Sequence, residues 1–217
     1  MRPIHVLAGV GVLLAAASEP RSSSACMNEV QRQLTPVQEI AAAEQDLDGA
    51  RLGEATHRVR VRYPSIRQLD GTAPPLALRA QRIYALALVR ADGSLDAQLG
   101  WARWGNLEWA VETLADLDAH RPNDPRSQAD LAEARTRLAR TRAEGVRVLE
   151  DLDRRDLLGS PYAYLALARA RRTAGDDGGA DAALRRCAVM AANPSRCDTD
   201  LAGEVASPTP PPARRGI

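Results

Sequence analysis

The chain has 217 residues, long enough for one domain of ordinary size with a sizeable core. Hydrophobic residues make up 45% of the sequence but aromatic residues only 3%, so alanine, leucine and valine must supply that core. Alanine and leucine are strong helix formers, and small side chains let helices approach closely. The 29 basic residues are all arginine and are balanced by 28 acidic ones, so the charge gives no reason to expect a nucleic-acid partner.

The first 25 residues have the pattern of a signal peptide. Arg2 gives a short basic start, and residues 6–17 form an unbroken apolar run that is too short to cross a bilayer comfortably. Small residues follow, which suit cleavage after Ala17 or after Ala25. An uncleaved membrane anchor is the alternative. We therefore expect an exported protein, periplasmic or extracellular.

Cys26 would be the first residue after the second of these cleavage sites, which is the place where a lipoprotein carries its lipid. That motif needs an apolar residue three positions earlier, and Ser23 stands there. A soluble form and a form anchored to the envelope through Cys26 both stay open. The signal segment and this cysteine are the only membrane contacts that we expect.

Local signals predict seven to nine helices and no strand. Thr35-Pro36-Val37-Gln38 starts the first helix, because Thr caps it, Pro suits its first position and Gln completes a capping box. This helix ends near Gly49, and a second one over residues 50–62 is closed by Tyr63-Pro64. The two form a diverged first hairpin.

Residues 76–90 read as one apolar-rich helix, which is either inserted into the array or belongs to a different type of hairpin. The next unit is expected to pair a helix over 95–103 with another over 107–120, joined at Gly105. Two further units follow, and they span residues 125–155 and 160–192.

Apolar residues recur in the chain at a fixed interval of 35 residues, which is typical of helical repeat arrays. The three copies are Ala110, Leu114 and Leu117, then Gly145, Leu149 and Leu152, then Ala180, Leu184 and Cys187. The last copy also carries Tyr164, Leu167, Ala168, Gly175 and Asn193-Pro194, and with these residues it resembles the tetratricopeptide repeat.

The resemblance is strongest over residues 162–194, extends to about residue 95, and is weak over 36–64. It implies an all-α fold of antiparallel helix hairpins stacked as a short α-solenoid, which would occupy residues 26–196. From residue 197 the chain becomes rich in proline, and we expect an extended, disordered tail over 197–217.

Cys187 and Cys197 lie at the end of the last unit, and in an oxidising compartment a disulfide could join them. Cys187 also takes the place of a repeat leucine, so a buried thiol is the alternative. With Cys26 the chain has three cysteines, and pairing of Cys26 with either of the others stays open.

The sequence carries no catalytic, cofactor-binding or metal-ligand motif, because its histidines stand far apart and no nucleophile elbow occurs. Trp101, Trp104 and Trp109 cluster around Gly105, where they either fill the seam between hairpins or offer an exposed anchor for a peptide.

The resemblance implies a groove lined by the first helix of each unit. Groove positions of the family fall on Tyr162, Arg169 and Arg172 in the last unit, and on Glu133 and Arg137 in the third. Arginine at such places suits an acidic peptide or a C-terminal carboxylate of another protein. We therefore expect a non-catalytic adaptor or assembly factor of the bacterial envelope. The alternatives are a structural spacer without a groove ligand and an enzyme with an unrecognised site.

Overall fold

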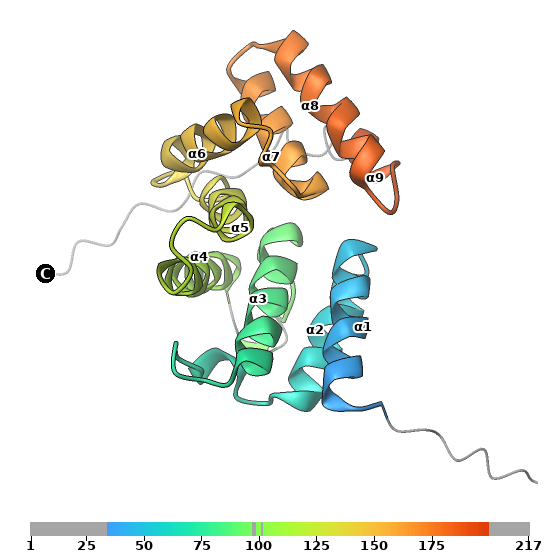
Figure 1. Ribbon diagram of the computed structural model, residues 1–217, viewed down its shortest axis with the longest axis vertical. Coiled ribbons are helices and arrows are strands. Elements are labelled where there is room, and N and C mark those ends of the chain that lie inside the picture. Colours follow the sequence, from blue (N-terminus) through green and yellow to red (C-terminus); the bar gives the residue numbers. More distant parts are fainter. Residues whose placement is uncertain (1–33, 97–98, 101, 200–217) are drawn as a thin grey trace, which may run out of the picture. The chain divides into compact units, whose positions relative to one another are not determined.

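The computed structural model describes residues 34–96, 99–100 and 102–199 (Figure 1). The signal peptide, Cys26, Trp101 and most of the predicted tail lie outside these residues. Residues 197–199, which the sequence analysis assigned to the tail, are helical.

The described residues form nine α-helices, one 3₁₀ helix and no strand, which confirms the all-α class and the stacked helical arrangement. The elements are α1 (Pro36–Asp48), α2 (Leu52–Arg62), η1 (Ile66–Gln68), α3 (Pro75–Arg90), α4 (Arg103–Ala119), α5 (Pro125–Arg135), α6 (Arg142–Arg154), α7 (Pro161–Thr173), α8 (Asp177–Met190) and α9 (Arg196–Thr199).

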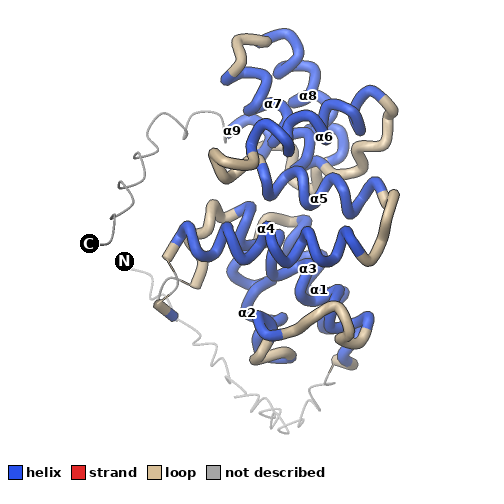
Figure 2. The backbone as a smooth tube through the Cα atoms, turned by 90° about the vertical axis from the view of Figure 1, so that its left-hand side faces the viewer, coloured by secondary structure: helices blue, strands red, loops and turns tan. Residues whose placement is uncertain are grey.

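Consecutive helices pair as four hairpins: α1 with α2, α3 with α4, α5 with α6, and α7 with α8 (Figures 1 and 2). The second helix of each hairpin packs on the first helix of the next, and α1, α3, α5 and α7 also contact one another in turn. Helices α1, α3, α5 and α7 therefore form one continuous layer, and the side chains of that layer are the ones to examine for binding.

The first helix of each hairpin begins with a proline at its first turn: Pro36, Pro75, Pro125 and Pro161. Proline suits this position because its missing N–H would have had no partner inside the helix. In three of the four helices a side chain caps the same turn, and α1 carries the complete capping box that the sequence predicts. Local chemistry thus sets the start of each hairpin.

The second hairpin differs from the sequence-based expectation. Among residues 95–103, those that the structure describes do not form a separate helix before α4. Instead α3 pairs directly with α4, and Gly105 lies inside α4. Asp92, Gly93 and Asp96 have positive φ angles of 52°, 72° and 60°, which a right-handed helix cannot accommodate. In the described part of the chain, α3 is therefore the first helix of this hairpin and not an inserted one, and the segment before it, which includes η1, adds to the length of the unit.

The apolar residues that recur every 35 positions occupy equivalent places on the second helices α4, α6 and α8, and most of them are buried. Gly145 stands where the other copies have alanine. A Cβ atom there would lie 2.7 Å from the carbonyl oxygen of Ala132, so the close approach of α5 and α6 requires glycine. At the end of the last hairpin a disulfide joins Cys187 of α8 to Cys197 of α9.

Candidate binding surfaces

Tyr162 and Glu133, two of the predicted groove residues, lie in a seam that joins the first helices of the four hairpins, α1, α3, α5 and α7. Glu133 of α5 is 2% exposed, and its carboxylate accepts a hydrogen bond from Arg90 of α3 at 3.2 Å. The Arg90 guanidinium lies over the Tyr162 ring, 3.8 Å from its centroid. The Tyr162 hydroxyl donates to the carbonyl oxygen of Asp48, at the end of α1, at 3.2 Å. These two side chains are therefore engaged within the protein itself.

Arg172, a third predicted groove residue, is directed toward α8. Its guanidinium pairs with Asp181 at 2.7 Å and lies 3.9 Å from Asp177. The sequence analysis grouped it with Arg169, but the structure separates the two. The reason is that Arg172 lies near the end of α7, next to the acidic first turns of α8.

Arg137 and Arg169, the remaining two, line one pocket of about 490 Å³ between the α5–α6 hairpin and α7. Arg142 at the start of α6 lines it as well, and we call it the arginine pocket. The other lining residues are small or apolar: Thr136, Ala139, Ala143, Val146, Ala166, Ala170, Thr173 and Ala174. Ala166 and Ala170 stand four apart on one face of α7, and their short side chains help to leave this space open.

No aspartate or glutamate is among the described residues that line the arginine pocket. Its volume is in the range of ligand-binding pockets. Three guanidinium groups beside an apolar wall suit an anionic group carried on an apolar chain. Sequence reasoning found Arg137 and Arg169 through the resemblance but missed Arg142, because nothing in the sequence shows that the start of α6 faces α7.

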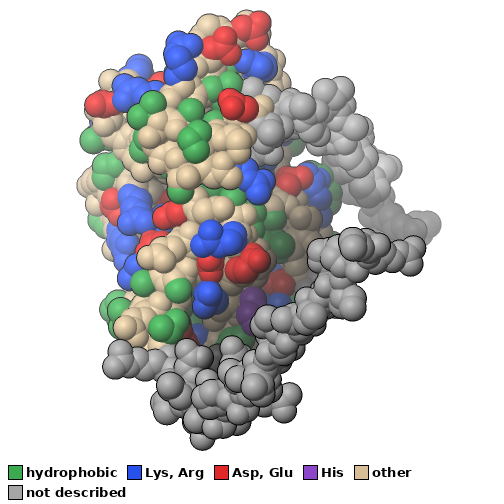
Figure 3. All heavy atoms as spheres, turned by 90° about the vertical axis from the view of Figure 1, so that its right-hand side faces the viewer, with side chains coloured by type: hydrophobic (Ala, Val, Ile, Leu, Met, Phe, Trp, Pro, Cys, Tyr) green, Lys and Arg blue, Asp and Glu red, His purple; other side chains and the backbone are tan. Residues whose placement is uncertain are grey.

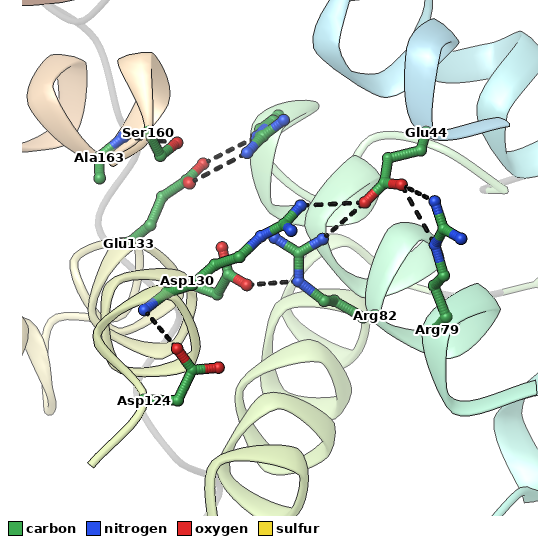
Figure 4. A network of polar contacts seen from close by, with 10 residues as sticks. Glu44, Arg79, Arg82, Asp124, Asp130, Glu133, Ser160 and Ala163 are labelled. Carbon is green, nitrogen blue, oxygen red and sulfur yellow. Dashed lines mark hydrogen bonds and ion pairs between the residues drawn. The ribbon is translucent and has the colours of Figure 1, made fainter. Parts of the chain in front are cut away.

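A second arginine cluster was not predicted. The Glu44 carboxylate of α1 contacts Arg79 and Arg82 of α3 and Arg126 of α5 (Figure 4). The Oε1 atom of Glu44 lies 3.4 Å from Nη1 of Arg82 and 3.0 Å from Nη2 of Arg126. Arg82 also donates to the carboxylate of Asp130, which is buried. We call Arg79, Arg82 and Arg126 the triple-arginine cluster.

The two carboxyl groups of this cluster have opposite pKa shifts. Burial raises the pKa of Glu44, but Arg79, Arg126 and Arg82 outweigh this effect, so its pKa lies below the ordinary value. Asp130 is more deeply buried. Desolvation raises its pKa, and the attraction of Arg82 offsets this only in part. Glu44 is thus the more firmly ionised of the two.

Trp104 and Trp109 both pack against the core as partly buried side chains. Trp109 meets Tyr84 edge to face at 5.6 Å, and the Arg67 guanidinium covers its ring at 4.7 Å. Trp104 lies under Arg103 instead. These contacts favour the seam-filling interpretation over an exposed aromatic anchor.

The outer surface has mixed charge. Figure 3 shows arginine side chains interspersed with aspartate and glutamate on the face it presents. In the described segments no three histidine, cysteine, aspartate or glutamate side chains gather as metal ligands. None of the helices described there combines the length and apolar composition that a bilayer-spanning helix needs.

No family model matches this chain, and neither a curated protein nor a solved structure is similar enough to be matched to it. Function must therefore be argued from the site itself, because a helical fold by itself does not imply one.

Proposed function

We propose that this protein is an exported binding module, a diverged tetratricopeptide-type array that acts as an adaptor or assembly factor of the bacterial envelope. Its ligand is an acidic segment of another protein. The observation that carries the proposal is the arginine pocket, in which Arg137, Arg142 and Arg169 lie beside a wall of small and apolar side chains. The carboxylates of such a segment would pair with the guanidinium groups, and its apolar side chains would cover the alanines.

A photo-crosslinking residue at Ala143 of the full-length chain tests this proposal in envelope extracts. Ala143 is exposed and lines the pocket. The same probe at Val189 is the control, because Val189 is 87% exposed on α8 and does not line it. We expect a protein that crosslinks only from residue 143, through a segment rich in aspartate or glutamate.

Charge reversal then gives the matched comparison. Arg142→Glu should reduce the crosslinked yield at least tenfold, because it places a like charge against the acidic ligand. Arg172→Glu should leave it unchanged, since Arg172 pairs with α8 outside the pocket. Equal yields from both variants, with unchanged circular dichroism, would contradict the proposal.

A structural spacer is the second candidate. It is favoured by the engagement of Tyr162 and Glu133 in contacts with other helices of the chain itself. A spacer would give the same crosslinks, or none, from residues 143 and 189, so the crosslinking experiment separates the two functions.

A further inference from the structure

The single negative charge of Glu44 lies among several arginine side chains. Three guanidinium groups, from two different helices, point at this one carboxylate (Figure 4). Two further acids lie beside the triple-arginine cluster: Asp130 pairs with Arg82, and the Asp124 carboxylate accepts a hydrogen bond from the backbone N–H of Arg126. With Arg121, four arginines and three acids (Glu44, Asp124 and Asp130) line the space beside this cluster, so a group with two negative charges in the place of Glu44 would complete the balance.

A pocket of about 350 Å³ lies next to this cluster. Glu44, Arg79, Arg82 and Arg126 all line it, as does the exposed Arg121. The rest of its wall consists of five apolar residues, Pro75, Leu76, Leu78, Leu114 and Leu117, together with Asp124, Ser127 and Asp130. A ligand in this space would thus meet arginines at one side and leucines at the other.

The cluster can be reached from solvent. The side chain of Arg126 is 64% exposed and that of Arg79 is 40% exposed, whereas Glu44 is mostly covered. An incoming anion can therefore contact the two outer arginines first. Rotation of the Glu44 side chain would then free the position between them without any change in the α1 backbone.

We propose that Glu44 occupies the anion position of a second binding site, and that the ligand of this site is a small organic phosphate with an apolar body. A phosphate monoester carries nearly two negative charges at neutral pH and three acceptor oxygens, which suits three guanidinium forks. The leucine wall holds the apolar body. Glu44 thus competes with the ligand and sets its affinity.

The test is isothermal titration of the full-length protein with monobutyl phosphate at low ionic strength. Glu44→Gln keeps the size of the side chain and removes its charge, so this variant should bind at least tenfold more tightly than the native chain. Arg126→Ala added to it should weaken binding at least fivefold. Butyrate, with a single charge, should bind at least fivefold more weakly than monobutyl phosphate.

Glu39→Gln is the matched control on the same helix, because Glu39 lies 3.9 Å from Arg62 and away from the cluster. It should bind like the native chain. Equal affinity of the Glu44→Gln and Glu39→Gln variants for monobutyl phosphate would overturn the proposal. Equal binding of inorganic phosphate and monobutyl phosphate to Glu44→Gln would overturn the apolar part of the assigned ligand.

Glu44→Asp serves as a second variant if Glu44→Gln does not fold. It keeps the charge but withdraws the carboxylate from the arginines, so its affinity should lie between those of the native chain and of Glu44→Gln. An affinity no higher than that of the native chain would again overturn the proposal. Loss of crosslinking at the arginine pocket would have no bearing on this result, since the two sites share no lining residue.

Discussion

At the scale of single residues, charged side chains act mainly as ties between helices. Asp46 of α1 is 5% exposed and accepts hydrogen bonds from Arg51 at 2.8 Å and from Arg58 of α2 at 2.7 Å. Burial raises its pKa, but the two arginines outweigh this, and the pKa lies below its ordinary value of 3.8. The first hairpin is therefore held in part by a carboxylate that must stay ionised.

Asp46→Asn should lower the free energy of unfolding at pH 7 by about 1–2 kcal/mol, because the charged hydrogen bonds are lost while both arginines stay largely solvated. A depressed pKa stabilises the folded state above pH 3.8, and this contribution is lost as the pH falls through the folded-state pKa. Urea titrations of both proteins at several pH values measure the difference. It should shrink toward zero in acid, and a constant difference would show that the ion pairs do not cause it.

At the scale of elements, two helical glycines that look alike in the sequence have different surroundings. Gly145 in α6 has the backbone of α5 against it, whereas an added Cβ at Gly105 would meet nothing within 4 Å. The sequence predicts that Gly105 joins two helices. The structure shows instead that the helix has already begun at Arg103.

Gly145→Ala should destabilise the protein by about 1–2 kcal/mol, since the new methyl group would be forced into the α5 backbone and helix propensity recovers only part of that cost. Gly105→Ala should instead stabilise it by about 0.5 kcal/mol, because alanine is the better helix former and the space is open. Denaturant unfolding of the two variants measures the change in the free energy of unfolding, which should be a decrease for Gly145→Ala and an increase for Gly105→Ala. Destabilisation by Gly105→Ala would argue that this residue lies in a turn.

At the scale of the whole described array, buried polar contacts join the first helices of the four hairpins, α1, α3, α5 and α7. Arg90 of α3 is 5% exposed and lies between Glu133 of α5 and the ring of Tyr162 of α7. Tyr162 in turn reaches the end of α1. One arginine therefore connects three hairpins, and the fourth is linked through the tyrosine. We expect the four hairpins to unfold as one cooperative unit.

Arg90→Met should cost about 3 kcal/mol of stability, because it leaves the buried carboxylate of Glu133 without its charge partner. The double variant Arg90→Met, Glu133→Leu should recover most of this loss, since two apolar side chains can fill the same space. Thermal and urea unfolding of the single and double variants give the coupling energy. As a control, Arg154→Met should change stability by less than about 0.5 kcal/mol, because its pair with Asp151 is exposed. Additive losses at residues 90 and 133 would show that the two side chains act independently.

The sequence alone determined the helices whose ends are encoded locally. Proline and a capping residue mark the starts of α1, α5 and α7. The apolar residues that recur every 35 positions mark the buried face of α4, α6 and α8. Helix starts and helical periodicity depend on neighbours within a turn or two, so they can be read along the chain.

Only the tertiary structure decided how α3 is paired and which charged residues meet. Glu44 and Arg126 are 82 positions apart, and Tyr162 and Asp48 are 114 apart. The tertiary structure also decided where the five predicted groove residues lie. Two are in the seam, two line the arginine pocket, and Arg172 forms an exposed ion pair with Asp181. Side-chain contacts between hairpins depend on the angle and offset at which the hairpins stack, and no local pattern in the sequence carries that information.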